Sequence, residues 1–94
     1  MKVIGFIWLD EIIDKLYYKH SVVPEEVQEI FDNHPKFRFV EKDYRPEEDV
    51  YFASGQTDAG RYLIVFFIYK HPHRVLIISA RNMDKKERRQ YERK

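Results

Sequence analysis

The chain has 94 residues, of which 44% are apolar and 16% aromatic, so it fits one folded domain with a modest core and excludes wholesale disorder. It contains no cysteine, which excludes disulfides, cysteine nucleophiles and thiolate metal sites. The net charge is only +1, but residues 1–49 carry 7 Lys/Arg and 12 Asp/Glu, whereas residues 50–94 carry 10 and 4. Such a chain can present one acidic and one basic face, unless folding mixes the two halves.

The first third of the chain predicts a short strand followed by two helices. Residues 2–8 read as an edge strand, and the acidic residues that follow argue against a signal peptide. Residues 10–20 have the spacing of a helix with one apolar face, formed by Ile12, Ile13, Leu16 and Tyr17. Pro24 suits the first position of a second helix over 24–33, whose expected buried residues are Val27, Ile30 and Phe31.

From residue 36 the apolar period changes to two, which is typical of strands. Strands are predicted over 36–42, 46–56, 61–69 and 74–81, and the segment 61–69 is apolar on both faces and therefore central. Gly60 can supply the positive φ of the turn before it. Asp84 and Glu87 fit a capping box that starts a basic helix over 84–93.

The predicted fold class is therefore α+β, in a single domain over residues 1–94. It has an antiparallel sheet of about four strands plus a short N-terminal strand, two N-terminal helices and one C-terminal helix. No segment approaches the length of a membrane span, and a cytoplasmic location is expected.

Arginines gather at the end of the last strand and in the helix after it. If 61–69 and 74–81 pair as a hairpin, Arg61 and Arg81 lie at the same end of the sheet, beside the start of the basic helix. In a regular strand Arg81 lies on the opposite face from Arg74, unless a bulge intervenes. A guanidinium forks onto two phosphate oxygens, so Arg81 and Arg61 are candidate phosphate ligands. Ordinary solvated surface charge is the simpler interpretation of Arg88, Arg89 and Arg93.

Three further residue types could transfer protons. His20 ends the first helix beside Lys19, where the helix dipole alone would also favour a cationic pair. Glu87 is explained by its capping position, and Tyr91 could contact phosphate or simply pack. A metal site at His71 and His73 lacks a third ligand.

These residues occur in an order that resembles the BrnT family of toxins. The similarity runs through Trp8, the Lys19-His20 pair and Glu25-Glu26 to Phe31. It continues through G-x-T-x-x-G-R-x-L at 55–63, R-x-x-I-I-S-A-R at 74–81 and E-R-x-x-Y at 87–91. The last two motifs are the more specific, and together the pieces span nearly the whole chain.

The chain departs from the family pattern in its first helix, which points to a divergent branch. Leu9 stands where the family has Asp after the Trp, Ile12 and Leu16 stand where it has Lys and Asn, and Ser21 replaces a glycine. The resemblance implies a RelE-like fold and metal-independent RNA cleavage without a cofactor. It also implies neutralisation, in a type II toxin–antitoxin system, by a DNA-binding antitoxin of the ribbon-helix-helix kind.

A ribonuclease without a metal can use the 2′-hydroxyl of RNA as its nucleophile, and then needs a base, an acid and cations for the phosphorane. The expected catalytic residues are His20, Arg81, Arg61 and Tyr91, and the expected substrate contacts are Lys19, Arg74 and Arg88. Which group is base and which is acid stays open. The alternative is a non-catalytic module that binds nucleic acid or an acidic protein through its basic half, and such a binder would not need His20 for turnover.

Overall fold

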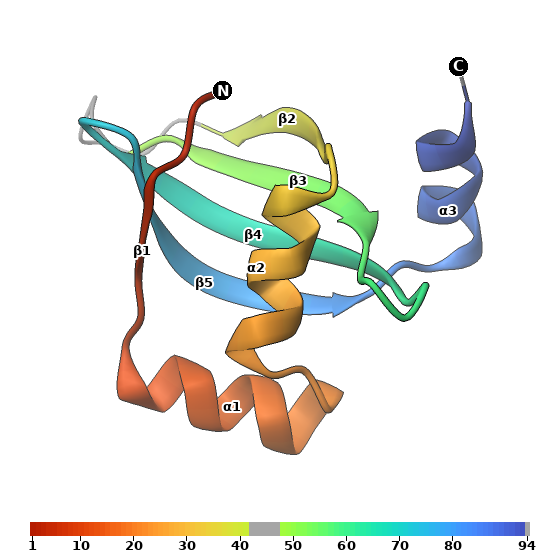
Figure 1. The fold of residues 1–94 in the computed structure, drawn as a ribbon, viewed down its shortest axis with the longest axis horizontal. Coiled ribbons are helices and arrows are strands. Elements are labelled where there is room, and N and C mark those ends of the chain that lie inside the picture. The colour runs from red at the N-terminus through yellow and green to blue at the C-terminus, as the bar shows by residue number, and fades with distance from the viewer. Residues whose placement is uncertain (42–47, 94) are drawn as a thin grey trace.

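The structure, a computed structural model, describes residues 1–41 and 48–93 and has the predicted order of elements (Figure 1). The helices are α1 (Asp10–His20), α2 (Pro24–Asp32) and α3 (Lys85–Glu92). The strands are β1 (Gly5–Ile7), β2 (Lys36–Glu41), β3 (Val50–Gln56), β4 (Tyr62–Lys70) and β5 (Arg74–Asn82). The α+β class is confirmed. Position 42 of the predicted strand 36–42 and positions 46–47 of the predicted strand 46–56 lie outside the described residues.

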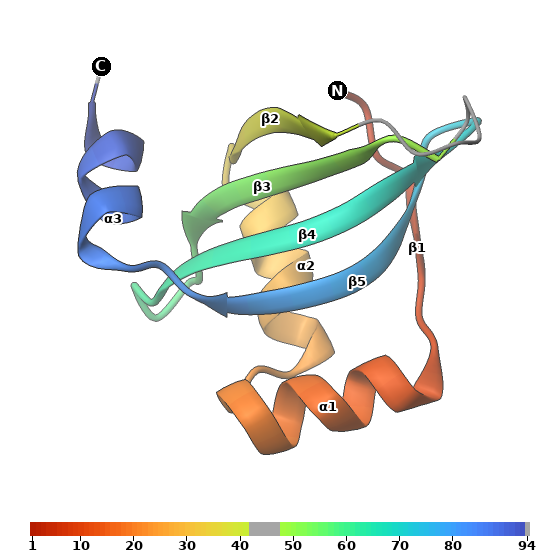
Figure 2. The same cartoon turned by 180° about the vertical axis from the view of Figure 1, so that it is seen from behind.

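The five strands form one sheet in the order β1-β5-β4-β3-β2. Strands β2 to β5 are antiparallel neighbours, and β1 runs parallel to β5 at the edge. The predicted central position of β4 and edge position of β1 are confirmed. Helices α1 and α2 cover one face of the sheet, whereas Figure 2 shows β2, β3, β4 and β5 from the other side with no helix across them.

The core lies between the sheet and the two N-terminal helices. Leu16 of α1 and Val27 and Ile30 of α2 are buried against the sheet. Phe67 of β4 is fully buried, and its ring packs against the rings of Phe31, Phe37 and Tyr51. The predicted apolar face of α1 is only partly right, because the side chain of Tyr17 is 56% exposed.

Strand β5 contains a bulge that reverses the direction of its side chains. Ile77 is opposite Phe67 and Ser79 is opposite Phe66, so Ile78 is an extra residue. Beyond it Ala80 is buried towards the helices, and Arg81 lies opposite Ile64 on the uncovered face. The exception that the sequence left open, a bulge in this strand, therefore applies: the extra residue changes the phase of the alternation and moves Arg81 away from the face of Val75 and Ile77.

Gly55 lets α2 approach β3 closely. A Cβ at this position would lie 3.2 Å from Cγ2 of Ile30 and 3.6 Å from Pro35. The packing of α2 on the sheet therefore depends on the missing side chain, which gives the first glycine of the 55–63 motif a structural reason. None of the helices within 1–41 and 48–93 is long and apolar enough to cross a lipid bilayer.

Ser21 ends α1 in the left-handed region, with φ 53° and ψ 39°. Residues with a Cβ are disfavoured there, and glycine is the usual C-terminal residue of this kind. We expect Ser21→Gly to stabilise the protein by about 0.5–1 kcal/mol and to raise the midpoint of thermal unfolding by roughly 2–8 °C. Ser79→Gly, within a strand, is the control and should lower the midpoint. A lower midpoint for Ser21→Gly would mean that the serine side chain stabilises this turn.

Candidate functional site

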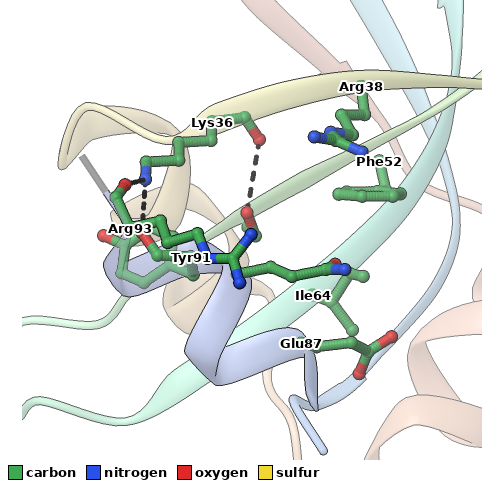
Figure 3. A pocket seen from close by; sticks show the side chains of 9 residues that line it. Lys36, Arg38, Phe52, Ile64, Glu87, Tyr91 and Arg93 are labelled. Carbon is green, nitrogen blue, oxygen red and sulfur yellow. Dashed lines mark hydrogen bonds between the residues drawn. The ribbon is translucent and has the colours of Figure 1, made fainter.

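A pocket of about 280 Å³ lies where α3 meets the uncovered face of the sheet (Figure 3). Three strands and the helix line it, and the lining residues are Lys36, Arg38, Phe52, Ser54, Ile64, Glu87, Gln90, Tyr91 and Arg93. The lining includes three cationic side chains and one carboxylate, so the pocket favours an anionic ligand. The two lining cations from β2 belong to the acidic half of the sequence, and folding brings them to the basic half.

Two cross-strand rows on the uncovered face contribute to the floor of this pocket and continue beyond it to β5. One row consists of Lys36, Ser54, Ile64 and Arg81, in the order β2 to β5. The neighbouring row consists of Arg38, Phe52, Phe66 and Ser79. Each row therefore has a cation at its β2 end, and the first has a second cation at its β5 end. The bulge in β5 is what brings Arg81 into this set.

Helix α3 forms the wall of the pocket and is fixed at both ends. At its start the backbone N–H of Glu87 donates to Asp84 Oδ1 over 2.7 Å, and the N–H of Asp84 donates to Glu87 Oε1 over 2.9 Å. The predicted capping box is thus confirmed. At its end Lys36 Nζ donates to the carbonyl oxygens of Tyr91 and Arg93, which have no partner within the helix. No residue of α3 is buried, so these contacts hold the helix in place.

Arg81 and Glu87 form a bidentate ion pair at the start of α3. Arg81 Nη1 lies 2.7 Å from Glu87 Oε1, and Nη2 lies 2.9 Å from Oε2. The hydrogen bond from Arg81 lowers the pKa of Glu87, and the hydrogen bond to Glu87 raises the pKa of Arg81. Glu87 is therefore a poor proton acceptor, and its carboxylate orients the guanidinium.

One side of the Arg81 guanidinium remains available to a ligand. Nη1 also donates to the carbonyl oxygen of Asn82 over 3.2 Å, but Nε and the second N–H of Nη2 have no partner among the described residues. Nε and Nη2 form the lateral fork of an arginine, which can bind two phosphate oxygens. The Arg81 side chain is 37% exposed, so an anion on the uncovered sheet face can reach this fork.

Arg61 lies at the same end of the sheet, as predicted, but its guanidinium is occupied. Nε donates to Asn82 Oδ1, Nη2 to the carbonyl oxygen of His20, and Nη1 to the carbonyl oxygen of Ser21 and to Glu26. All three nitrogen atoms thus donate to the protein itself. This geometry favours a positioning role for Arg61 over the expected contact with phosphate.

His20 is held near the end of β5 by that clamp. A single guanidinium joins its carbonyl oxygen, at 2.7 Å, to the side chain of Asn82, at 2.8 Å, and Asn82 follows Arg81 in the chain. The His20 side chain is half-buried and does not line the pocket. Lys19 precedes it and is exposed.

Of the remaining predicted site residues, Tyr91 lines the pocket, whereas Arg88 and Arg74 do not. Tyr91 lines the pocket, with its ring centroid 6.0 Å from that of Tyr62 and 5.2 Å from Lys36 Nζ. Arg88 lies over the ring of Tyr62, at 4.0 Å, and pairs with Glu92. Arg74 starts β5 and is seven residues from Arg81, roughly 23 Å along an extended strand. The structure therefore places Tyr91 in the pocket and Arg81 beside it, paired with the lining residue Glu87, and leaves Arg74 at the far end of the sheet.

Lys36, Arg38 and Phe52 were missed as functional candidates. A signal for Arg38 was present, because the alternation in 36–42 puts it on the face opposite Phe37, which packs against the core. Within residues 1–41 and 48–93, no three His, Asp or Glu side chains are grouped as metal ligands. Nδ1 of His73 instead lies 3.2 Å from the hydroxyl of Tyr69.

The molecule is a small α+β protein whose uncovered sheet face is lined with cations beside a short basic helix. The profile of the family described as the ribonuclease toxin BrnT of type II toxin–antitoxin systems matches residues 8–87. That match covers most of the chain, and the chain belongs to the BrnT family of ribonuclease toxins.

The fold is also similar to that of a solved protein. The crystal structure of the ribonuclease toxin BrnT from Brucella abortus superposes with a TM-score of 0.69 at 15% sequence identity. The alignment covers 88% of this chain and 100% of the Brucella chain, and it shows that the two share a fold. No curated protein sequence matches this chain significantly.

Proposed function

We propose that this protein cleaves RNA on the uncovered face of its sheet by directing the 2′-hydroxyl of the RNA at the adjacent phosphate, without a metal ion. The observation that carries the proposal is Arg81. Glu87 orients its guanidinium, and its lateral fork is available beside a pocket with further cations. We expect the reaction to take place in the cytoplasm.

The proposed roles follow from what each group contacts. Arg81 binds a non-bridging oxygen of the scissile phosphate and stabilises the charge that develops on the phosphorane. Glu87 positions Arg81 through the bidentate ion pair, and the hydrogen bond from Arg81 lowers the pKa of Glu87, which favours its charged form. Arg61 positions the segment that contains His20 relative to the end of β5.

Proton transfer needs two more groups, one for the 2′-hydroxyl and one for the leaving 5′-oxygen. His20 is the proposed carrier at the end of α1, and Tyr91 is the candidate within the pocket. The balance is complete without another reactant: the 2′-oxygen forms a bond to phosphorus, the bond to the 5′-oxygen breaks, and one proton leaves as another arrives. The product is a 2′,3′-cyclic phosphate and a 5′-hydroxyl.

This chemistry predicts cleavage in the presence of a chelator. Purified protein with EDTA should cut single-stranded RNA and leave fragments with a cyclic phosphate end, which mass spectrometry of the products would identify. An RNA of the same sequence with 2′-O-methyl groups is the control and should stay intact, because its nucleophile is blocked. Loss of cleavage in EDTA, with recovery on addition of Mg²⁺, would contradict the metal-independent mechanism.

We further propose that the antitoxin expected from the family, of the ribbon-helix-helix kind, covers the same pocket with an acidic segment. Its carboxylates would pair with Arg38 and Arg81, and apolar side chains would cover the rings on the open face. Steering between opposite charges makes association fast and sensitive to salt. Stopped-flow mixing with the partner should show an association rate that falls as NaCl rises and that falls further in Arg81→Ala. A rate independent of salt would argue against this binding mode.

A further inference from the structure

Two aromatic rings lie on the uncovered sheet face beside the pocket. Phe52 of β3 and Phe66 of β4 are directly opposite each other, with ring centroids 5.9 Å apart and an interplanar angle of 68°. Both are only half-buried, and no helix crosses this part of the sheet (Figure 2). Phe52 lines the pocket itself, so its ring is available to a ligand (Figure 3).

Cations lie on both sides of this pair. Arg38 of β2 is opposite Phe52 and exposed, and its side chain forms no hydrogen bond or ion pair with a described residue. On the other side Arg81 Cζ lies 5.7 Å from the centroid of Phe66. The strands β2 and β5 are three strand spacings apart, about 14 Å. A chain that crosses the sheet between them meets a cation, an aromatic pair and a second cation.

Polar groups near the ring could contact the edge of a planar ligand. The hydroxyl of Ser54 donates only one long hydrogen bond, of 3.5 Å, to the carbonyl oxygen of Lys36. The side-chain amide of Gln90, which also lines the pocket, has no partner within the described part of the chain. Together they offer donors and acceptors beside Phe52. The pocket of about 280 Å³ is at the lower end of ligand sites, which suits one planar base more than a peptide helix.

We infer that this pocket holds one unpaired nucleobase of the RNA, stacked on Phe52, with neighbouring phosphates on Arg38 and Arg81. The inference rests on the proposed function and adds a base-binding subsite to it. Single-stranded nucleic acids are bound in this way elsewhere, because every base has a face that can stack on an aromatic ring while cations hold the backbone. The subsite therefore selects for a base that is free to leave its own stack, and so for single-stranded RNA.

The test measures the affinity for two probes that cannot be cleaved. One is a short single-stranded 2′-O-methyl RNA, and the other is an abasic chain of the same length and charge. We expect Phe52→Leu to weaken binding of the RNA by about 10-fold and to leave binding of the abasic chain unchanged, because only the stacking is lost. Phe52→Tyr should bind like the parent protein. Phe39→Leu, an exposed ring that contacts Tyr51, is the matched control.

The subsite is refuted if Phe52→Leu binds the RNA as tightly as the parent protein, or if it weakens both probes equally. A loss that affects only antitoxin binding would assign Phe52 to the protein partner instead. Should Phe52→Leu fail to fold, Phe52→Trp decides, because the larger indole should tighten binding of the RNA alone. Cleavage of natural RNA is assayed separately, and its absence in the parent protein would refute the proposed function whatever the probes show.

Discussion

Arg81→Ala is expected to lower the rate of RNA cleavage by about 10²–10³-fold, which corresponds to about 2.7–4 kcal/mol of transition-state stabilisation in comparable sites. Among residues 1–41 and 48–93, the lateral fork of Arg81 has no partner that phosphate would have to replace, and Glu87 already holds the guanidinium in place. Arg81→Lys keeps the charge but loses the fork, so its rate should lie between those of the parent protein and the alanine variant. Single-turnover cleavage of a labelled RNA measures all three.

The alanine variant also leaves Glu87 without its partner, and this change needs its own control. An unpaired carboxylate beside the pocket would repel RNA, so part of the loss could come from Glu87 and not from the missing arginine. The double variant Arg81→Ala/Glu87→Gln removes that charge. If the double variant cleaves at the parental rate, Arg81 is a neutralising partner of Glu87, and its proposed role at the phosphate is wrong.

His20→Ala is expected to reduce turnover by about 10²-fold or more, the usual contribution of a group that transfers protons. Binding of a non-cleavable RNA should hardly change. The variant is informative because Arg61 binds the backbone carbonyl of His20, so the alanine keeps the clamp to Asn82. Steady-state cleavage gives kcat, and thermal unfolding checks that the fold is intact.

The matched control for this variant is His71→Ala, which removes an exposed histidine in the turn between β4 and β5. It should cleave like the parent protein. If His20→Ala also cleaves at the parental rate, His20 is only a cation at a helix end. Proton transfer must then come from Tyr91, which lines the pocket, or from Lys19, since the ion pair with Arg81 makes Glu87 a poor proton acceptor.

The helices and strands of this fold could be predicted from the sequence, but the direction of the side chains at the end of β5 could not. Local signals gave the two N-terminal helices, the central position of β4 and the capping box at Asp84, because each depends on residues close together in the chain. The bulge at Ile78 is not visible in the periodicity, since the segment is apolar at every position from 75 to 78. Without the bulge, Arg81 would be assigned to the covered face.

The residues of the site could also be predicted from the sequence only in part. Arg81 and Tyr91 could be selected from their residue types, but the contact of Lys36 with the end of α3 joins residues 55 positions apart in the chain. Arg61 is of the residue type that commonly binds phosphate. Only the four protein groups that accept its hydrogen bonds indicate a structural role instead. Partners of this kind depend on tertiary packing, which a linear pattern does not contain.

The location of the RNA on the protein is tested most directly by an NMR titration with the non-cleavable 2′-O-methyl RNA. The Nε–H signal of Arg81 and the ring signals of Phe52 and Phe66 should shift as RNA is added, because these groups surround the available fork and the pocket. The ring signals of Tyr17 and Tyr18, which are 56% and 87% exposed on α1, should stay in place. Shifts confined to the tyrosines of α1, with Arg81 unchanged, would show that RNA binds elsewhere and would contradict cleavage on the uncovered sheet face.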